Sequence, residues 1–171
     1  MCKKFFTFLL IFFVTTNLYA DLPHYIDFKF ILNESDAGKK AQDHLKNKFN
    51  KGIENIDKKK KSLQEEERKI IDQKKLIKPE EYKEKVNKLR TKVQSLQKER
   101  NQLLETVSKQ RNKAKSELLK ALNPIISNYM KEKKIRMVID KKNLLLADDG
   151  LDITKDIINL LNKNLKTIKL N

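Results

Sequence analysis

Two long stretches of the chain carry apolar residues at helical spacing. In the first, one apolar residue recurs every seven positions, a repeat that keeps its members on one line of a gently supercoiled helix. In the second, apolar residues recur at alternating spacings of three and four. We predict that the two helices pack antiparallel and meet in a seam. The predicted seam consists of Phe49, Ile56, Leu63, Ile70 and Ile77 from the first helix and Tyr82, Leu89, Leu96 and Leu103 from the second.

The residue numbers of the two stripes support this pairing. In an antiparallel pair with little stagger, the numbers of contacting residues have a constant total, because one number rises as the other falls. Five pairs total 159: Ile77 with Tyr82, Ile70 with Leu89, Leu63 with Leu96, Ile56 with Leu103 and Leu45 with Ala114. The turn between the helices is therefore expected near residues 78–80.

The expected turn contains residues that favour a helix end followed by a helix start. Pro79 suits the first turn of a helix, and Glu80 suits the positive end of the helix dipole. The lysines before them suit the negative end of the preceding helix. The hairpin is thus predicted to have a basic tip formed by Lys74, Lys75 and Lys78.

The segments on either side of the hairpin contain short patterns typical of strands. Apolar and polar side chains alternate in residues 25–32, with the sequence Y-I-D-F-K-F-I-L, and again in residues 135–139. Residues 144–147 form a further apolar run. We predict three strands. The buried faces of the first two are expected to form an oligomer core of Ile26, Phe28, Phe30, Ile135, Met137 and Ile139.

Several helix features are also predicted. Ser35 can cap the first hairpin helix, and Thr154 can cap a last helix that begins there. Pro124 predicts a kink in the second hairpin helix. Gly38 and Gly52 lie inside the first helix, where we expect either close packing by another part of the chain or a looser arm.

These elements give an α+β fold class that is mostly α. A small β-core body formed by residues 21–35 and 125–171 would carry a long antiparallel hairpin arm over residues 36–124. A body of only about 50 residues is marginal as a single core. Three short strands also leave unpaired edges. We therefore predict a symmetric oligomer with a shared β-core, although the sequence alone gives no copy number.

Residues 1–20 have the three-part pattern of a secretory signal peptide. Lys3 and Lys4 form a basic start, residues 5–14 form an apolar run, and cleavage is expected after Ala20. An uncleaved N-terminal anchor is the alternative. Cleavage would remove Cys2, the single cysteine, so the mature chain would have no disulfide and no thiolate metal site.

The positive charge of the chain lies mainly in the hairpin. The whole sequence has a formal net charge of +16, of which residues 36–78 carry +6 and residues 79–134 carry +8. A basic rod on a nearly neutral base suggests acidic partners, such as unfolded acidic protein, anionic lipid or nucleic acid. The alternative is that Lys-rich helix faces are simply solvated.

The sequence offers little for catalysis or for binding a metal. The two histidines, His24 and His44, have no nucleophile paired with them. Asp148, Asp149 and Asp152 lack the ligand pattern of a calcium loop and are expected to be turn and cap residues. We expect no enzyme activity, no cofactor and no metal site.

Physiological binding of nucleic acid is not expected either. Proteins that bind single strands stack bases on aromatic side chains placed among basic residues. Between residues 63 and 122 the hairpin contains only one aromatic residue, Tyr82. A signal peptide would also send the chain away from the chromosome. Electrostatic binding to DNA in vitro would depend strongly on salt.

Three segments resemble the Skp/OmpH family of periplasmic chaperones. These segments are Y-I-D-F-K-F-I-L-N-E-S-D-A-G-K-K-A at 25–41, I-R-M-V-I-D-K at 135–141 and L-D-I-T-K-D-I-I-N-L-L-N at 151–162. They follow a signal peptide in the family's order, with a Lys/Glu/Gln-rich hairpin between them, so the resemblance covers essentially the whole mature chain.

The resemblance implies a homotrimer with a small β-barrel body and three helical arms that enclose a cavity. It also implies that the protein holds unfolded outer-membrane proteins soluble in the periplasm, without ATP, before they are inserted in the membrane. The family has no catalytic residues to transfer to this chain. A different class of protein remains open: a structural envelope protein whose basic arms lie on anionic lipid or lipopolysaccharide.

Overall fold

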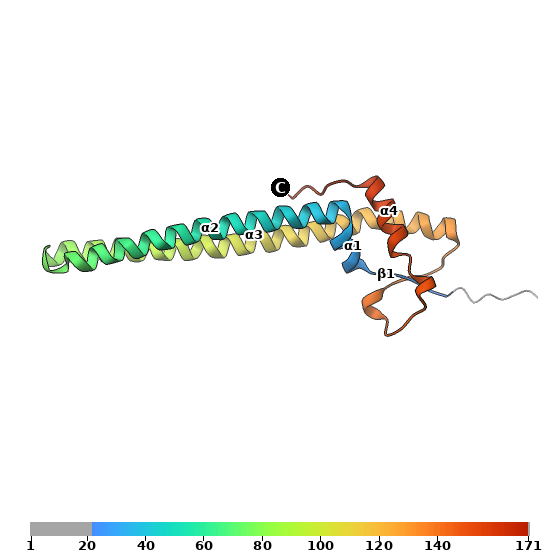
Figure 1. Cartoon of the computed structure of the whole chain (residues 1–171), viewed down its shortest axis with the longest axis horizontal. Helices are drawn as coiled ribbons and strands as arrows, with labels where there is room; N and C mark the ends of the chain where they lie inside the picture. The colour runs from blue at the N-terminus through green and yellow to red at the C-terminus, as the bar shows by residue number, and fades with distance from the viewer. Residues whose placement is uncertain (1–21, 171) are drawn as a thin grey trace, which may run out of the picture.

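The computed structural model of the protein describes residues 22–170 and shows a small body with one long arm (Figure 1). Helix α2 (Asp36–Asp72) and helix α3 (Pro79–Lys133) run antiparallel and form the arm. At about 1.5 Å per residue, a helix of the length of α2 spans roughly 55 Å. The predicted signal peptide lies outside the described residues. Among residues 22–170, no helix is long and apolar enough to cross a membrane.

Residues with known preferences for helix ends stand at the starts of both arm helices. Ser35 is the N-cap of α2, and its side-chain oxygen accepts a hydrogen bond from the Gly38 N–H at 3.2 Å. Pro79 is the first residue of α3. The turn includes the short helix η1 (Gln73–Lys75) and occupies residues 73–78, so it begins several residues before the predicted position at 78–80.

The predicted strand over residues 25–32 is wrong beyond Ile26. Strand β1 covers only His24–Ile26, and helix α1 (Phe28–Glu34) follows at once. Asp27 is the N-cap of α1, because its carboxylate accepts a hydrogen bond from the Phe30 N–H at 2.8 Å. The helix places Ile31, which is fully buried, against the core. Packing therefore overrides the alternating pattern of this segment.

Only one of the two strands predicted after the hairpin is present. Strand β2 covers Val138–Asp140 and pairs in parallel with β1 in a two-stranded sheet, with His24 opposite Val138. Residues 144–147 form no strand. The apolar run there pairs with no strand of residues 22–170, and Leu145 and Leu146 are almost completely exposed. Two short helices flank this loop: η2 (Lys141–Asn143) and η3 (Asp149–Leu151).

The last helix, α4 (Thr154–Asn164), begins at the predicted residue but is capped differently. Thr154 is already helical, and its N–H donates to the carboxylate of Asp152 at 2.8 Å. The Thr154 hydroxyl instead accepts a hydrogen bond from the Asp27 N–H at 2.8 Å. This contact ties the start of α4 to the start of α1, so the predicted cap joins two distant parts of the body.

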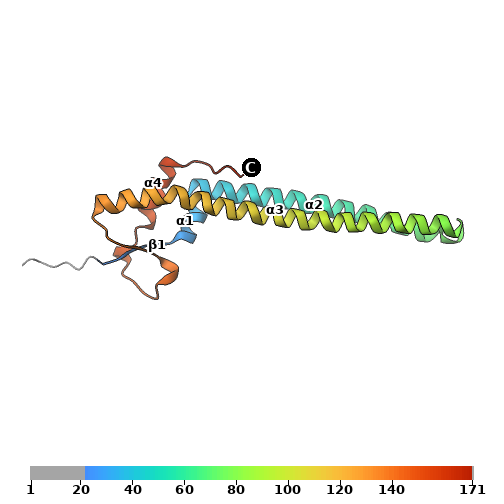
Figure 2. The ribbon, with the colours of Figure 1, turned by 180° about the vertical axis from the view of Figure 1, so that it is seen from behind.

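The body is packed around the end of α3. Its fully buried side chains come from α1, α3 and α4, which meet at this end of the arm (Figure 2). Helix α3 continues through Pro124 as one helix, and so extends the rod of the arm into the body. The core is formed by Ile26, Ile31, Ala37, Leu118, Leu122, Ile153, Ile157 and Leu161.

Candidate functional site

The arm is held together by a thin apolar seam. All nine predicted seam residues are at least half-buried, but only Ile56 and Ile70, at 7% and 6% exposure, are fully buried. Leu63 and Leu96, one of the predicted pairs, line the same shallow groove between the helices. Val93, which belongs to the same apolar stripe, is half exposed. The seam therefore buries one row of side chains and leaves most of both helices in contact with water.

Two ion pairs cross the arm on one side of the seam. Lys59 and Lys92 of opposite helices reach the carboxylates of Glu99 and Glu66, each at 2.7 Å. These pairs are exposed, and an exposed ion pair stabilises a protein by about 1 kcal/mol at most. The sides of the arm thus add little resistance to a change in spacing between the helices.

Ion pairs within single helices also mark the arm. The carboxylates of Glu54, Glu84 and Glu105 each accept a hydrogen bond from a lysine four residues later, which lowers their pKa values. These glutamates stay ionised, and each neutralises one lysine. The positive charge left over belongs to lysines and arginines distributed over the outer faces of both helices.

The tip of the arm presents the three predicted lysines to solvent. Lys74, Lys75 and Lys78 are all exposed, and the first two belong to the short helix of the turn. The ammonium of Lys74 lies 5.9 Å from the centre of the Tyr82 ring. A cation over an aromatic face gains a modest attraction. The tip is therefore a small cationic surface with one aromatic side chain beneath it.

A larger groove lies at the root of the arm, and sequence reasoning did not find it. It has a volume of about 880 Å³ and runs between α2 and α3. Its lining is largely apolar and also includes three exposed cations, Lys46, Arg111 and Lys115, and one carboxylate, Asp43. Leu104 lines the groove and is 45% exposed. The apolar lining consists of Leu32, Ala41, Leu45, Phe49, Leu104, Val107, Ala114 and Ile168.

Two glycines of α2 mark close packing near this groove. A β-carbon added at Gly38 would lie 2.1 Å from the Leu32 carbonyl oxygen, and one added at Gly52 would lie 2.5 Å from a methyl group of Leu103. Gly38 therefore needs a residue without a side chain, because the obstacle is backbone, whereas at Gly52 the obstacle is the end of a side chain that can rotate. In the sequence, this close packing is indicated only by the two glycines inside the predicted first helix.

The six predicted oligomer-core residues separate into two groups. Ile26, Phe28 and Ile135 pack in or against the core of the body. Phe30 and Met137, at 44% and 57% exposure, lie on the surface of the single chain. Ile139 is half-buried in strand β2. The body thus keeps apolar side chains on its surface while having a closed core of its own.

One titratable pair is formed within the body. The hydroxyl of Tyr129 donates to the carboxylate of Asp156 at 2.5 Å. Burial, together with this hydrogen bond, raises the pKa of Tyr129 to about 12. Nothing nucleophilic lies beside the pair in the contacts of the described residues, and it ties α3 to α4. Within residues 22–170 there is also no cluster of three His, Cys, Asp or Glu side chains that could hold a metal ion.

Comparisons with known proteins give a family and a fold. The model of a family described as outer membrane protein (OmpH-like) matches residues 24–161. A crystal structure of a proposed outer membrane chaperone (OmpH-like) from Caulobacter crescentus CB15 is similar, with a TM-score of 0.79 and 21% sequence identity. The match covers 86% of this chain and 89% of that chain, and shows a common fold. No curated protein gave a significant match.

Proposed function

Because the chain belongs to the OmpH-like family of outer membrane proteins, we propose that it is an ATP-independent holdase chaperone for unfolded outer-membrane proteins. The observation that carries this proposal is the arm. It joins a thin seam and a mostly cationic surface to an apolar groove at its root. Such a surface offers many weak contacts to an unfolded chain and no single tight site.

The mechanism that we propose is purely non-covalent. Apolar segments of a client contact the groove, while its acidic residues are attracted to lysines and arginines of the arm. Each contact is weak, but several on one client act together through effective concentration. The client is therefore kept from aggregating, and it leaves when a partner such as the membrane insertion machinery competes for the same segments. No nucleotide is needed for either step.

We propose that three copies assemble through their bodies and enclose the client between their arms. The exposed apolar side chains of each body, including Phe30, Met137, Leu145 and Leu146, favour this assembly because burying them stabilises the oligomer. Because Tyr25 of β1 forms a parallel bridge with Asp152, the outer edge of β2 is the edge that neighbouring copies can extend. We place the assembly in the periplasm after removal of residues 1–20 at Ala20.

The test follows aggregation and complex mass together. The chain without residues 1–20 is mixed with a urea-unfolded outer-membrane β-barrel, and the urea is diluted while light scattering is recorded. We expect suppressed scattering and a discrete complex of one oligomer with client. A folded globular protein such as lysozyme, in place of the unfolded barrel, should give no complex. Unchecked aggregation beside an inert oligomer would refute the holdase proposal.

A second candidate function rests on the arm tip. Lys74, Lys75 and Lys78 form a cationic surface that could lie on anionic lipid or lipopolysaccharide, as in a structural envelope protein. The test measures co-sedimentation with vesicles that contain anionic lipid, using the parent and a variant with all three lysines changed to Gln. We expect weaker binding by the variant. Equal binding would remove the tip as the lipid contact.

A further inference from the structure

The segment after the last helix does not leave the molecule. Beyond α4, residues 165–170 turn back and run along the root of the arm toward its tip (Figures 1 and 2). We call residues 165–170 the strap. The family match ends at residue 161, so the strap lies outside the part of the chain that defines the family.

The strap is fixed at its far end by both arm helices. Leu170, with 6% exposure, packs in a small cluster with Ala41 and Leu45 of α2 and Ala114 of α3. Its carbonyl oxygen accepts a hydrogen bond from the Gln110 side-chain amide at 2.7 Å. Gln110 in turn accepts a hydrogen bond from the Lys48 ammonium at 3.0 Å. One glutamine therefore connects the strap to both helices of the arm.

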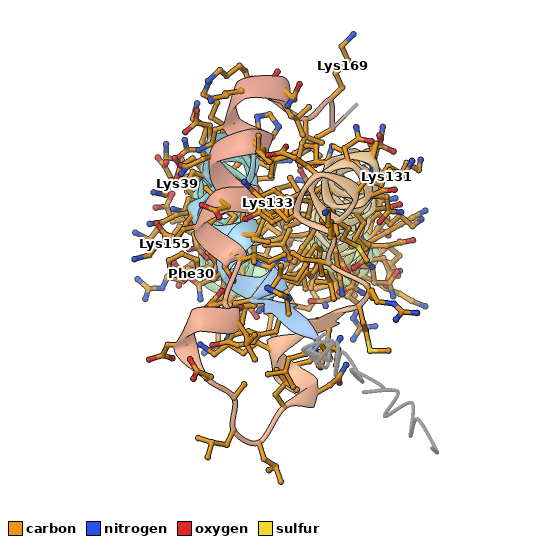
Figure 3. The ribbon with its side chains drawn as sticks, turned by 90° about the vertical axis from the view of Figure 1, so that its right-hand side faces the viewer. Phe30, Lys39, Lys131, Lys133, Lys155 and Lys169 are labelled. Carbon is orange, nitrogen blue, oxygen red and sulfur yellow. The ribbon has the colours of Figure 1, made fainter. Side chains whose placement is uncertain are left out.

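The strap also fills part of the groove at the arm root. Ile168 lines that groove together with the residues of the arm, and Leu170 packs on Ala41, Leu45 and Ala114, which line it too. The strap is not helical. Its residue Leu170 packs on the arm helices, Ile168 packs against both this cluster and the body core, and Lys169 projects away from the molecule (Figure 3). A short non-helical peptide with apolar side chains is thus already seated at one end of an open apolar groove.

The ties that hold the strap are few and mostly near water. Besides the Gln110 hydrogen bond, Lys166 pairs with Asp36 at 3.3 Å, and both of these side chains are exposed. Leu165 and Ile168 are half-buried and pack against the edge of the body core. The body core, by contrast, contains side chains with no exposure at all. No residue of the strap belongs to that buried core, so release of the strap would leave the core side chains packed on one another.

We propose that the strap is an internal competitor for the groove and that a client segment displaces it. This inference rests on the holdase proposal and adds a regulated site to it. The competing segment would be extended, with apolar residues that replace Ile168 and Leu170. Acidic residues beside them would pair with the rim cations Lys46, Arg111 and Lys115. Without client, the strap covers part of the apolar surface of the groove. When a client segment binds, the strap leaves that surface.

The direct test places a probe on the strap. The chain without residues 1–20 has no cysteine, so a single nitroxide label can be attached at Lys169→Cys, with Lys155→Cys on α4 as the control site. On addition of a urea-unfolded outer-membrane β-barrel, we expect the label at residue 169 to gain mobility and the label at 155 to stay unchanged. Client binding without any gain at residue 169 would refute this inference alone. No client binding by the unlabelled parent would refute the holdase proposal as well.

The second test weakens the strap and measures client affinity. If the strap occupies the groove in nine of ten molecules, its release should lower the apparent Kd about tenfold, because only the free groove binds. Leu170→Ser removes the buried anchor, and Leu76→Ser at the exposed arm tip is its matched control. Circular dichroism shows whether Leu170→Ser is folded. If it is not, Gln110→Ala, which removes the hydrogen bond to the strap, replaces it in the affinity measurement. If the folded strap variant binds client with the same Kd as the parent or a higher one, the strap does not compete with client for the groove.

Discussion

The body and the arm of this protein are built on different amounts of buried surface. In the body, Ile31, Leu118, Ile157 and Leu161 have no exposed surface, and they come from three different helices. Along the arm beyond its root, the seam is one side chain wide and most of both helices is exposed. The two regions share helix α3, which passes from one to the other without a break. The difference between them is therefore one of packing.

Because of this difference, the body can supply stability while the arm supplies a surface for binding. A core with contacts on all sides resists change, because every lost contact leaves a void. A single seam permits the helices to shift relative to each other at small cost. The same protein can thus keep one fixed shape in the body, where we propose that copies assemble, and present an adaptable surface along the arm, where we propose that clients bind. The following changes test that division.

The largest effect is expected from a truncation in the body. Changing Leu118 to Ala removes a fully buried side chain and should lower the free energy of unfolding by about 2–5 kcal/mol. Its neighbour Leu119 is 39% exposed, so Leu119→Ala is a matched control with a loss of about 1 kcal/mol or less. Urea unfolding followed by circular dichroism measures both. Equal losses for the two variants would contradict a closed core in the body.

The next comparison adds one methyl group at each glycine of α2. At Gly38, near the body, the new methyl group would strike the Leu32 backbone. We therefore expect Gly38→Ala to lower the free energy of unfolding by about 1–3 kcal/mol. At Gly52, in the arm, the methyl group would strike the end of the Leu103 side chain, which can rotate. Alanine also favours the helix by about 1 kcal/mol, so Gly52→Ala should be nearly neutral. Thermal melting checks the ranking, and a more damaging change at Gly52 would overturn it.

The arm could be predicted from the sequence because its pattern is long. Apolar residues repeat over many helical turns, and a repeat of that length fits neither a strand nor a loop. The antiparallel register also follows from residue numbers. Lys59 with Glu99 and Glu66 with Lys92 cross the arm at totals of 158, one less than the predicted seam pairs. The turn falls earlier than expected because α2 ends at Asp72 and several residues are needed to reverse the chain.

The body was harder to predict because its segments are short. Residues 25–32 alternate as a strand would, but Phe28, Ile31 and Leu32 also fall on one side of a helix that Asp27 caps. Phe30, which the strand pattern placed with Phe28, is exposed in this helix. The run at residues 144–147 pairs with no strand in the described part of the chain, so its apolar pattern alone could not determine its structure. In such short segments the local sequence is compatible with more than one secondary structure, and packing against the rest of the body selects one.

The groove at the arm root could not be predicted at all. It depends on how closely α2 and α3 approach at Ala41 and Ala114, and on where the strap lies. The strap has only three apolar residues, too few to show a period. The seam residues and the basic tip stay predictions as functional residues, and the sequence pointed to neither the groove nor the strap.

A smaller effect is expected from the same conservative change in both regions. Ile157→Val in the body and Ile56→Val in the arm each remove one methyl group from a buried side chain. Such changes lower the free energy of unfolding by about 0.5–1.5 kcal/mol, and we expect the body variant at the upper end because its surroundings cannot close the gap. Native-state hydrogen exchange should show faster exchange confined to the arm for Ile56→Val. Faster exchange throughout the molecule would mean that arm and body unfold as one unit.

The smallest effect is expected from the ion pair that joins Lys59 to Glu99 across the arm. A double-mutant cycle with Ala at each position should give a coupling of about 0.2–1 kcal/mol, because both side chains are exposed. The coupling should shrink toward zero in 1 M salt, where the screening length is only about 3 Å. A coupling above about 2 kcal/mol that resisted salt would mean that polar pairs, and not the apolar seam, hold the two helices at a fixed distance. In that case the arm would be as rigid as the body, and client binding would have to proceed without any change in the spacing of its helices.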